Sequence, residues 1–130
     1  MSPQQAPSEQ VIAVVVWAPV ERRWFAANRQ RLLDALAAQG QACGAATVDC
    51  FERILPAGGL GARMSAAVAR AIRQEAERLL LLHRQGPQRI VCTVCHGDGG
   101  QSVLLLALPL GNDGVISASW LQALLRDGLQ

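Results

Sequence analysis

The stretch RIVCTVCHGDGGQSVLLLAL, residues 89–108, contains two apolar runs that a glycine-rich segment separates. The runs at 89–96 and 102–108 are rich in β-branched and aliphatic residues, which favours strands. Between them lies Gly97-Asp98-Gly99-Gly100, and an Asp-Gly pair between two such runs is a strong β-hairpin signal. The stretch therefore predicts two antiparallel strands joined by a tight turn.

Two further strands and three helices are predicted around this hairpin. The run VIAVVVW at 11–17 is continuously apolar, which is typical of a strand buried on both faces, and Pro19 is expected to end it. A weaker strand is predicted at 43–51, where glycine and alanine lower the β propensity. The first predicted helix spans 20–39, and Gly40 is expected to end it. The second spans 62–84 and ends at Gly86-Pro87. A third begins near Ser117 or Ser119.

The predicted element order is β-α-β-α-β-β-α, which indicates an α/β fold with a mixed sheet and helices packed on it in two or three layers. The first β-α-β unit predicts a parallel strand pair. This order resembles that of thioredoxin-like domains, a fold that supports many activities. The resemblance implies a dithiol directly after the first strand, where this chain has Ala18-Pro19-Val20-Glu21 and no cysteine. We expect a flexible leader at 1–10 and a single domain at 11–130.

The composition narrows the classes of function. Apolar residues make up 51% of the 130 residues and the formal net charge is +2, which argues against disorder and against a nucleic-acid partner. The chain has no lysine and no tyrosine, so Schiff-base lysines and tyrosine acid–base chemistry are excluded. The apolar run at 11–18 is too short to span a bilayer, and no positive charge precedes it as in an export signal. We therefore expect a cytoplasmic protein without membrane insertion, with its cysteines reduced.

The most specific motif is CxxCH, formed by Cys92, Cys95 and His96. This spacing is the attachment signature of c-type haem, and a CxxC pair can also act as a redox dithiol or supply zinc ligands. Residues i and i+3 of a strand point to opposite faces, so the two sulfurs should diverge. We therefore expect incidental cysteines in a strand, with no cofactor and no metal. A redox-linked or metal-linked protein is the alternative.

A glycine-rich segment, PAGGLGARMS at 56–65, is the second candidate site. Gly58, Gly59 and Gly61 could offer backbone N–H groups to a phosphate or a small ligand, and Arg63 could add positive charge. The segment lacks the spacing and the lysine of a Walker loop, so we favour an ordinary connection between a strand and a helix. A small-ligand sensor with its site here is a further alternative.

The helix predicted at 62–84 carries more apolar surface than one face needs. Leucines occupy 79–82 consecutively, so Leu81 or Leu82 is expected to face another protein or a second copy of the chain. His83 is expected to cap the C-terminus of the helix, and the Ser102 hydroxyl to satisfy backbone groups of a turn. No catalytic constellation stands out. The sequence therefore predicts a non-catalytic interaction or accessory domain of a bacterial-type multi-component system.

Overall fold

The computed structural model describes residues 13–42, 44, 47–57, 64–86, 89–109, 123, 125 and 126. Over these residues the order β-α-β-α-β-β confirms the predicted α/β fold. The elements are β1 (Ala13–Glu21), α1 (Arg22–Ala42), β2 (Thr47–Ile54), α2 (Ala66–Gln85), β3 (Arg89–His96), a 3₁₀ turn (Asp98–Gly100) and β4 (Gln101–Pro109). The leader at 1–10 and the predicted starts of the last helix, Ser117 and Ser119, lie outside the described residues; Ala123, Leu125 and Arg126 are helical.

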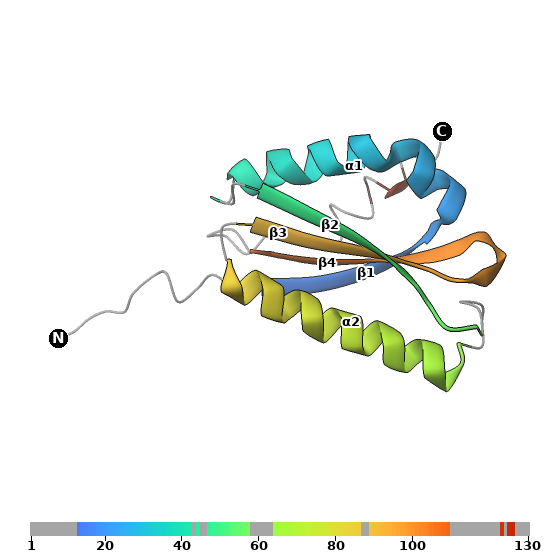
Figure 1. The fold of residues 1–130 in the computed structure, drawn as a ribbon. Helices are drawn as coiled ribbons and strands as arrows, with labels where there is room; N and C mark the ends of the chain where they lie inside the picture. The colour runs from blue at the N-terminus through green and yellow to red at the C-terminus, as the bar shows by residue number, and fades with distance from the viewer. Residues whose placement is uncertain are drawn as a thin grey trace.

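The strands of the described residues form one sheet in the order β1-β4-β3-β2 (Figure 1). β4 pairs antiparallel with both β1 and β3, and β2 pairs parallel with β3. The predicted hairpin of β3 and β4 is confirmed and forms the centre of the sheet. Its turn places Gly99 and Gly100 at φ +76° and +81°, a backbone conformation that favours glycine.

The predicted parallel pair between the first two strands is wrong, because β1 and β2 lie at opposite edges of the sheet. α1 leads from one edge to the other, and the parallel pair forms between β2 and β3, which α2 connects. The likeness to thioredoxin-like domains therefore extends to the order of the elements and not to the pairing of the first two strands.

β1 is an edge strand, and not the doubly buried strand that its apolar run indicated. Most of its residues are only partly buried, and Trp17 is 61% exposed. The strand also continues through Pro19, which was expected to end it, as far as Glu21. An edge strand tolerates proline because one of its flanks has no ladder hydrogen bonds to lose. The strands buried on both faces are β3 and β4, at the centre.

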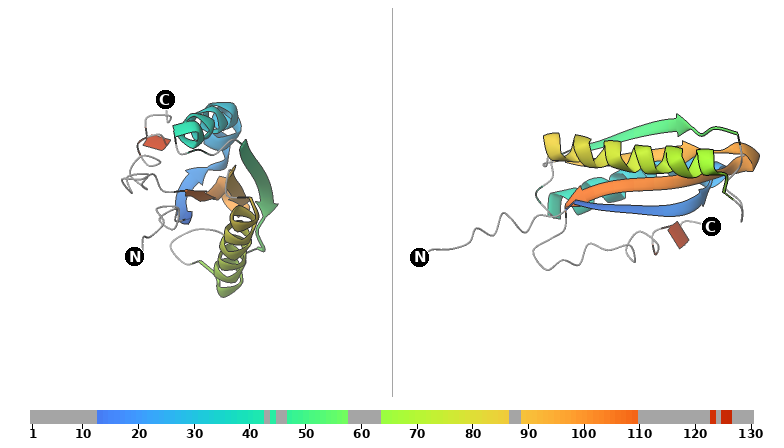
Figure 2. Two further views of the ribbon diagram at one scale, coloured as in Figure 1. Left: turned by 90° about the vertical axis from the view of Figure 1, so that its left-hand side faces the viewer. Right: turned by 90° about the horizontal axis from the view of Figure 1, so that it is seen from below.

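The two helices cover opposite faces of the sheet, so the described residues form three layers (Figure 2). We call the two apolar clusters the α1-side core and the α2-side core. The buried residues of the α1-side core are Trp24, Phe25, Leu32, Leu36, Ile90, Cys92, Val94, Leu104, Leu106 and Leu108. Those of the α2-side core are Leu55, Val68, Ile72, Leu79, Val91, Cys95, Val103, Leu105 and Ala107.

Two predicted boundaries around α1 and β2 are shifted. Gly40 was expected to stop the first helix, but α1 continues to Ala42 with Gly40 buried inside it. Gly44, at φ +85°, follows the helix, and its N–H donates to the Gln41 carbonyl at 3.3 Å, as in a helix C-cap. β2 spans Thr47–Ile54 rather than 43–51, because its parallel register with β3 runs from Thr47 opposite Arg89 to Ile54 opposite His96.

Candidate functional site

The CxxCH residues all lie in β3, but their side chains do not converge. Cys92 belongs to the α1-side core and Cys95 to the α2-side core, and both thiols are fully buried. His96 lies on the α1 side, where its ring packs against Phe25 with ring centroids 6.0 Å apart. The two sulfurs therefore cannot bind one haem, form one disulfide or ligate one metal without a change in β3. Cys92 instead lies opposite Cys50 of β2 in the parallel register.

A hydrogen-bonded chain of three side chains connects β2, β3 and β4. His96 Nε2 lies 2.8 Å from Glu52 Oε1, and His96 Nδ1 lies 2.8 Å from Ser102 Oγ. His96 and Ser102 are 5% and 1% exposed, whereas the Glu52 carboxylate is half-exposed. Arg29 of α1 holds the other carboxylate oxygen, with its Nε 3.8 Å from Glu52 Oε2. This outer end of the chain borders a pocket of about 280 Å³, which Phe25 also lines.

The partners of His96 determine which groups donate. An ionised carboxylate can only accept, so Nε2–H donates to Glu52. The Nδ1 atom of neutral His96 then accepts from the Ser102 hydroxyl. This order of carboxylate, imidazole and hydroxyl is also the one that activates a serine in hydrolases, although Ser102 is fully buried in β4. The expectation that Ser102 bonds to the backbone of a turn is therefore wrong, because its hydroxyl bonds to His96 across the hairpin.

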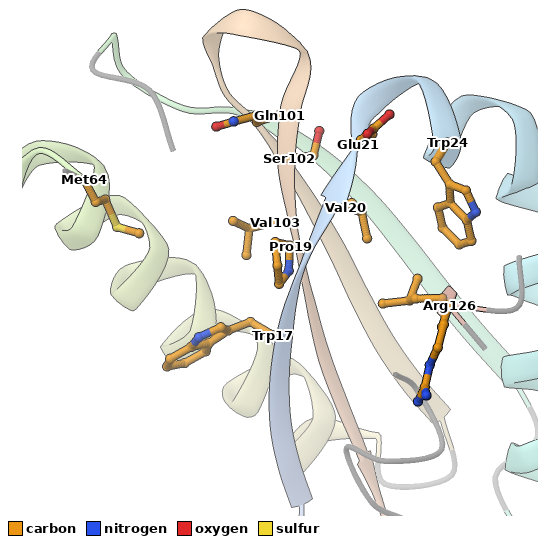
Figure 3. A pocket seen from close by; sticks show the side chains of 11 residues that line it. Trp17, Pro19, Val20, Glu21, Trp24, Met64, Gln101, Ser102, Val103 and Arg126 are labelled. Carbon is orange, nitrogen blue, oxygen red and sulfur yellow. The ribbon is translucent and has the colours of Figure 1, made fainter. Parts of the chain in front are cut away.

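A partly open cavity of about 470 Å³ lies along the edge strand β1. Figure 3 shows Trp17 and Met64 on the side of α2, and Trp24 and Arg126 on the side of α1, with β1 between them. The lining residues that the structure describes are Trp17, Pro19, Val20, Glu21, Trp24, Met64, Gln101, Ser102, Val103, Leu125 and Arg126. The lining is thus largely apolar, with polar groups from the ends of β1 and β4 and from Arg126.

Two polar groups at this cavity differ in their hydrogen bonding. The Ser102 hydroxyl is already committed to His96. The Trp24 indole N–H is buried and has no acceptor among the described residues. A buried donor without an acceptor costs about 1–3 kcal/mol. Among the lining residues that the structure describes, Glu21 contributes a carboxylate and Arg126 a guanidinium, so neither sign of charge dominates there.

On the α2 side of the sheet, the end of α2 is fixed to the start of β3. His83 does not cap the helix as expected: its Nδ1–H donates to the Arg89 carbonyl at 3.0 Å, which buries the ring. The last carbonyls of α2 are capped by the Gly86 N–H and by Arg89 Nη2, which donates to the Leu82 carbonyl at 3.1 Å. Arg89 also forms an ion pair with Asp49 of β2 at 2.9 Å.

The remaining candidate residues are placed as follows. Leu81 is 58% exposed on α2, whereas the half-buried Leu82 packs against the α2-side core. The candidate ligand loop, with Gly58, Gly59, Gly61 and Arg63, lies outside the described residues. No group of three His, Cys, Asp or Glu side chains in the described part of the chain could hold a metal ion. No described helix is long and apolar enough to cross a membrane.

The residues that form these sites come together only in the folded sheet. Cys50 and Glu52 lie on β2 and Ser102 lies on β4, and only the register of the sheet places them beside Cys92 and His96 of β3. The sequence carries one signal for these sites: Cys50 and Glu52 are two residues apart, and Cys92 and His96 are four residues apart. Residues two or four apart share one face of a strand. No protein family, no curated protein and no solved structure matches this chain at a significant level.

Proposed function

We propose that the protein is a binding domain for a small, mostly apolar molecule that occupies the cavity beside β1. The observation that carries this proposal is the presence of Trp17, Trp24 and Met64 around one cavity of about 470 Å³. Small-molecule sites typically have volumes of about 300–1,000 Å³ and are lined by aromatic and aliphatic side chains with a few polar groups. A small-ligand site was an alternative for the glycine-rich segment at 56–65; we propose the site beside β1 instead, and Met64 belongs to that segment.

The lining also indicates the chemistry of the ligand. Since Glu21 and Arg126 contribute opposite charges, we expect a neutral molecule. Its apolar body would cover Trp17, whose ring is 61% exposed.

Binding can be tested with a neutral naphthylamine dye whose emission rises in apolar surroundings. Titration with excitation of tryptophan should show saturable energy transfer to the dye, because two tryptophans line the cavity. We expect Trp17→Ala and Met64→Arg each to weaken binding about tenfold, equivalent to about 1.4 kcal/mol. Both side chains are exposed, so both variants should fold with an unchanged circular dichroism spectrum.

Ile54→Ala is the matched control, because Ile54 is also an exposed large apolar residue but does not line the cavity. It should bind the dye as the unmodified protein does. Equal affinities for the unmodified protein, Trp17→Ala and Met64→Arg would show that the dye binds elsewhere and would refute the proposed site. The absence of saturable binding to the unmodified protein would refute it as well.

A second candidate function is the accessory role in which α2 packs against another copy of the chain. The exposure of Leu81 on α2 is the observation that favours it, since leucine is usually buried. Leu81→Arg should convert an assembly to monomer in sedimentation velocity. Gln85→Arg, which adds the same charge at an exposed position of the same helix, should not. If the unmodified protein sediments as a monomer at its highest soluble concentration, self-association through α2 is contradicted.

A further inference from the structure

Cys50 and Cys92 occupy directly paired positions of the parallel strands β2 and β3. Both lie on the face of the sheet that α1 covers, where Cys50 packs against the α1-side core. Neighbouring strands are about 4.8 Å apart. Because the Cα atoms of disulfide-bonded cysteines are about 4.4–6.8 Å apart, the spacing of neighbouring strands lies within the range that a disulfide between paired positions requires. Both thiols are free.

The two thiols differ in access and in acidity. Cys50 is on an edge strand and partly exposed, whereas Cys92 is fully buried. The hydrogen bond from Cys92 lowers the pKa of Cys50 although burial opposes it, and the positive charge of Arg29 lowers it further. The hydrogen bond to Cys50 and burial both raise the pKa of Cys92 well above its usual value. Cys50 is therefore the thiol that ionises, and Cys92 keeps its proton and donates it to the Cys50 sulfur.

We propose that Cys50 and Cys92 form a redox-active dithiol that exchanges with low-molecular-weight disulfides such as glutathione disulfide. Cys50 releases its proton to solvent, and its thiolate attacks one sulfur of the small disulfide. The S–S bond of that disulfide breaks, Cys50 forms a mixed disulfide, and one glutathione thiolate leaves. Cys92 then loses its proton and attacks the Cys50 sulfur, and the second glutathione thiolate leaves.

The products balance the two steps. The Cys50–Cys92 dithiol gives two electrons to glutathione disulfide and becomes a disulfide, and the two protons of the cysteines convert the released thiolates to two molecules of glutathione. The exposed position of Cys50 makes it the attacking residue, and its register with Cys92 makes Cys92 the resolving one. This pair differs from the CxxC pair of the sequence, and it lies toward the sheet edge opposite the cavity beside β1.

Cys95 provides an internal comparison. It is fully buried in the α2-side core, on the other face of β3. Burial raises its pKa to about 12. Cys95 should therefore stay reduced under conditions that oxidise the pair, and iodoacetamide should alkylate Cys50 at least about tenfold faster than Cys95 in the folded protein.

The experiment uses the full chain carrying Cys43→Ser and Cys95→Ser, so that Cys50 and Cys92 are its only cysteines. After incubation with excess glutathione disulfide and an acid quench, we expect the loss of both free thiols and of two hydrogens from the intact mass, with no retained adduct. In the same background, Cys92→Ala should stop at a glutathione adduct on Cys50. Cys50→Ala should retain a free Cys92.

Two results would overturn the proposal. One is two free thiols after this incubation in a variant that retains the circular dichroism spectrum of the unmodified protein. The other is a glutathione adduct that stays on Cys50 while Cys92 is present. If the variants fail to fold, peptide mapping of the oxidised unmodified protein provides the same test. A Cys50–Cys92 link supports the proposal, whereas a Cys92–Cys95 link or no link contradicts it.

Discussion

Removal of Ser102 or His96 should reveal how much the buried Glu52–His96–Ser102 chain contributes to stability. Ser102→Ala leaves His96 Nδ1 without its 2.8 Å partner at a ring that is 5% exposed. His96→Leu leaves the Ser102 hydroxyl without a partner at a side chain that is 1% exposed. The Glu52 carboxylate, which also loses its partner in His96→Leu, is destabilised less, because it is half-exposed and can bind water and Arg29. Each single substitution therefore leaves one buried polar atom unpaired.

The size of the effect follows from that unpaired atom. A buried polar group without a partner costs about 1–3 kcal/mol, so each single variant should lose about 2 kcal/mol of unfolding free energy. The double variant removes both partners and leaves neither unpaired, so its loss should be only about 1 kcal/mol, which is smaller than either single loss and far below the additive value of about 4 kcal/mol. At about 4 °C per kcal/mol for a chain of this length, each single substitution should lower the Tm by about 8 °C.

Urea unfolding followed by circular dichroism and by tryptophan fluorescence measures these free energies, and coincident transitions would establish two-state behaviour. The control combines Ser102→Ala with Ser65→Ala. Ser65 caps α2, where its Oγ accepts from the Val68 N–H at 3.1 Å, and it does not take part in the chain. These two losses should add within about 0.5 kcal/mol. Additivity of the same quality between Ser102→Ala and His96→Leu would refute the hydrogen-bonded chain.

The other predictions concern Glu75 and the hairpin turn. The Glu75 carboxylate bonds to Arg78, and its Oε1 atom lies 3.5 Å from Arg53 Nε. Burial raises the pKa of Glu75, but the hydrogen bond from Arg78 and the positive charges of Arg78 and Arg53 outweigh it, so the pKa is lowered. Because the folded-state pKa is below the unfolded one, this stabilisation is present above the unfolded pKa and is lost as the pH falls through the folded pKa. Glu75→Gln should cost about 1 kcal/mol at neutral pH and nothing in acid, as measured by urea unfolding across pH. A loss that does not depend on pH would count against the ion pairs. Gly100→Ala should lower the free energy of unfolding by about 1–2 kcal/mol. Gly100 has φ +81°, and an added Cβ meets no atom within 4 Å, so the loss comes from backbone strain alone. Unchanged stability in thermal unfolding would contradict this turn conformation.

The sequence alone was sufficient for those features that depend on neighbours along the chain. The apolar runs of the hairpin, its Asp-Gly turn and the periodicity of α2 are local, and β3, β4 and α2 lie close to where they were predicted. The period of two along a strand also placed Cys92 and Cys95 on opposite faces correctly. These features follow from backbone geometry and from the burial of one face, both of which act over a few residues.

Features that depend on strand order had no such signal. The run at 11–17 is apolar enough for a central strand, yet β3 and β4 form the centre of the sheet. β1 is therefore an edge strand that contains Pro19 and borders a cavity. Glu52 and His96 are 44 residues apart. They meet because the parallel register sets Ile54 opposite His96, and the same register places Cys50 opposite Cys92. Which strands become neighbours depends on how both faces of the whole sheet are buried, and a shift of one residue would move each of these side chains to the other face.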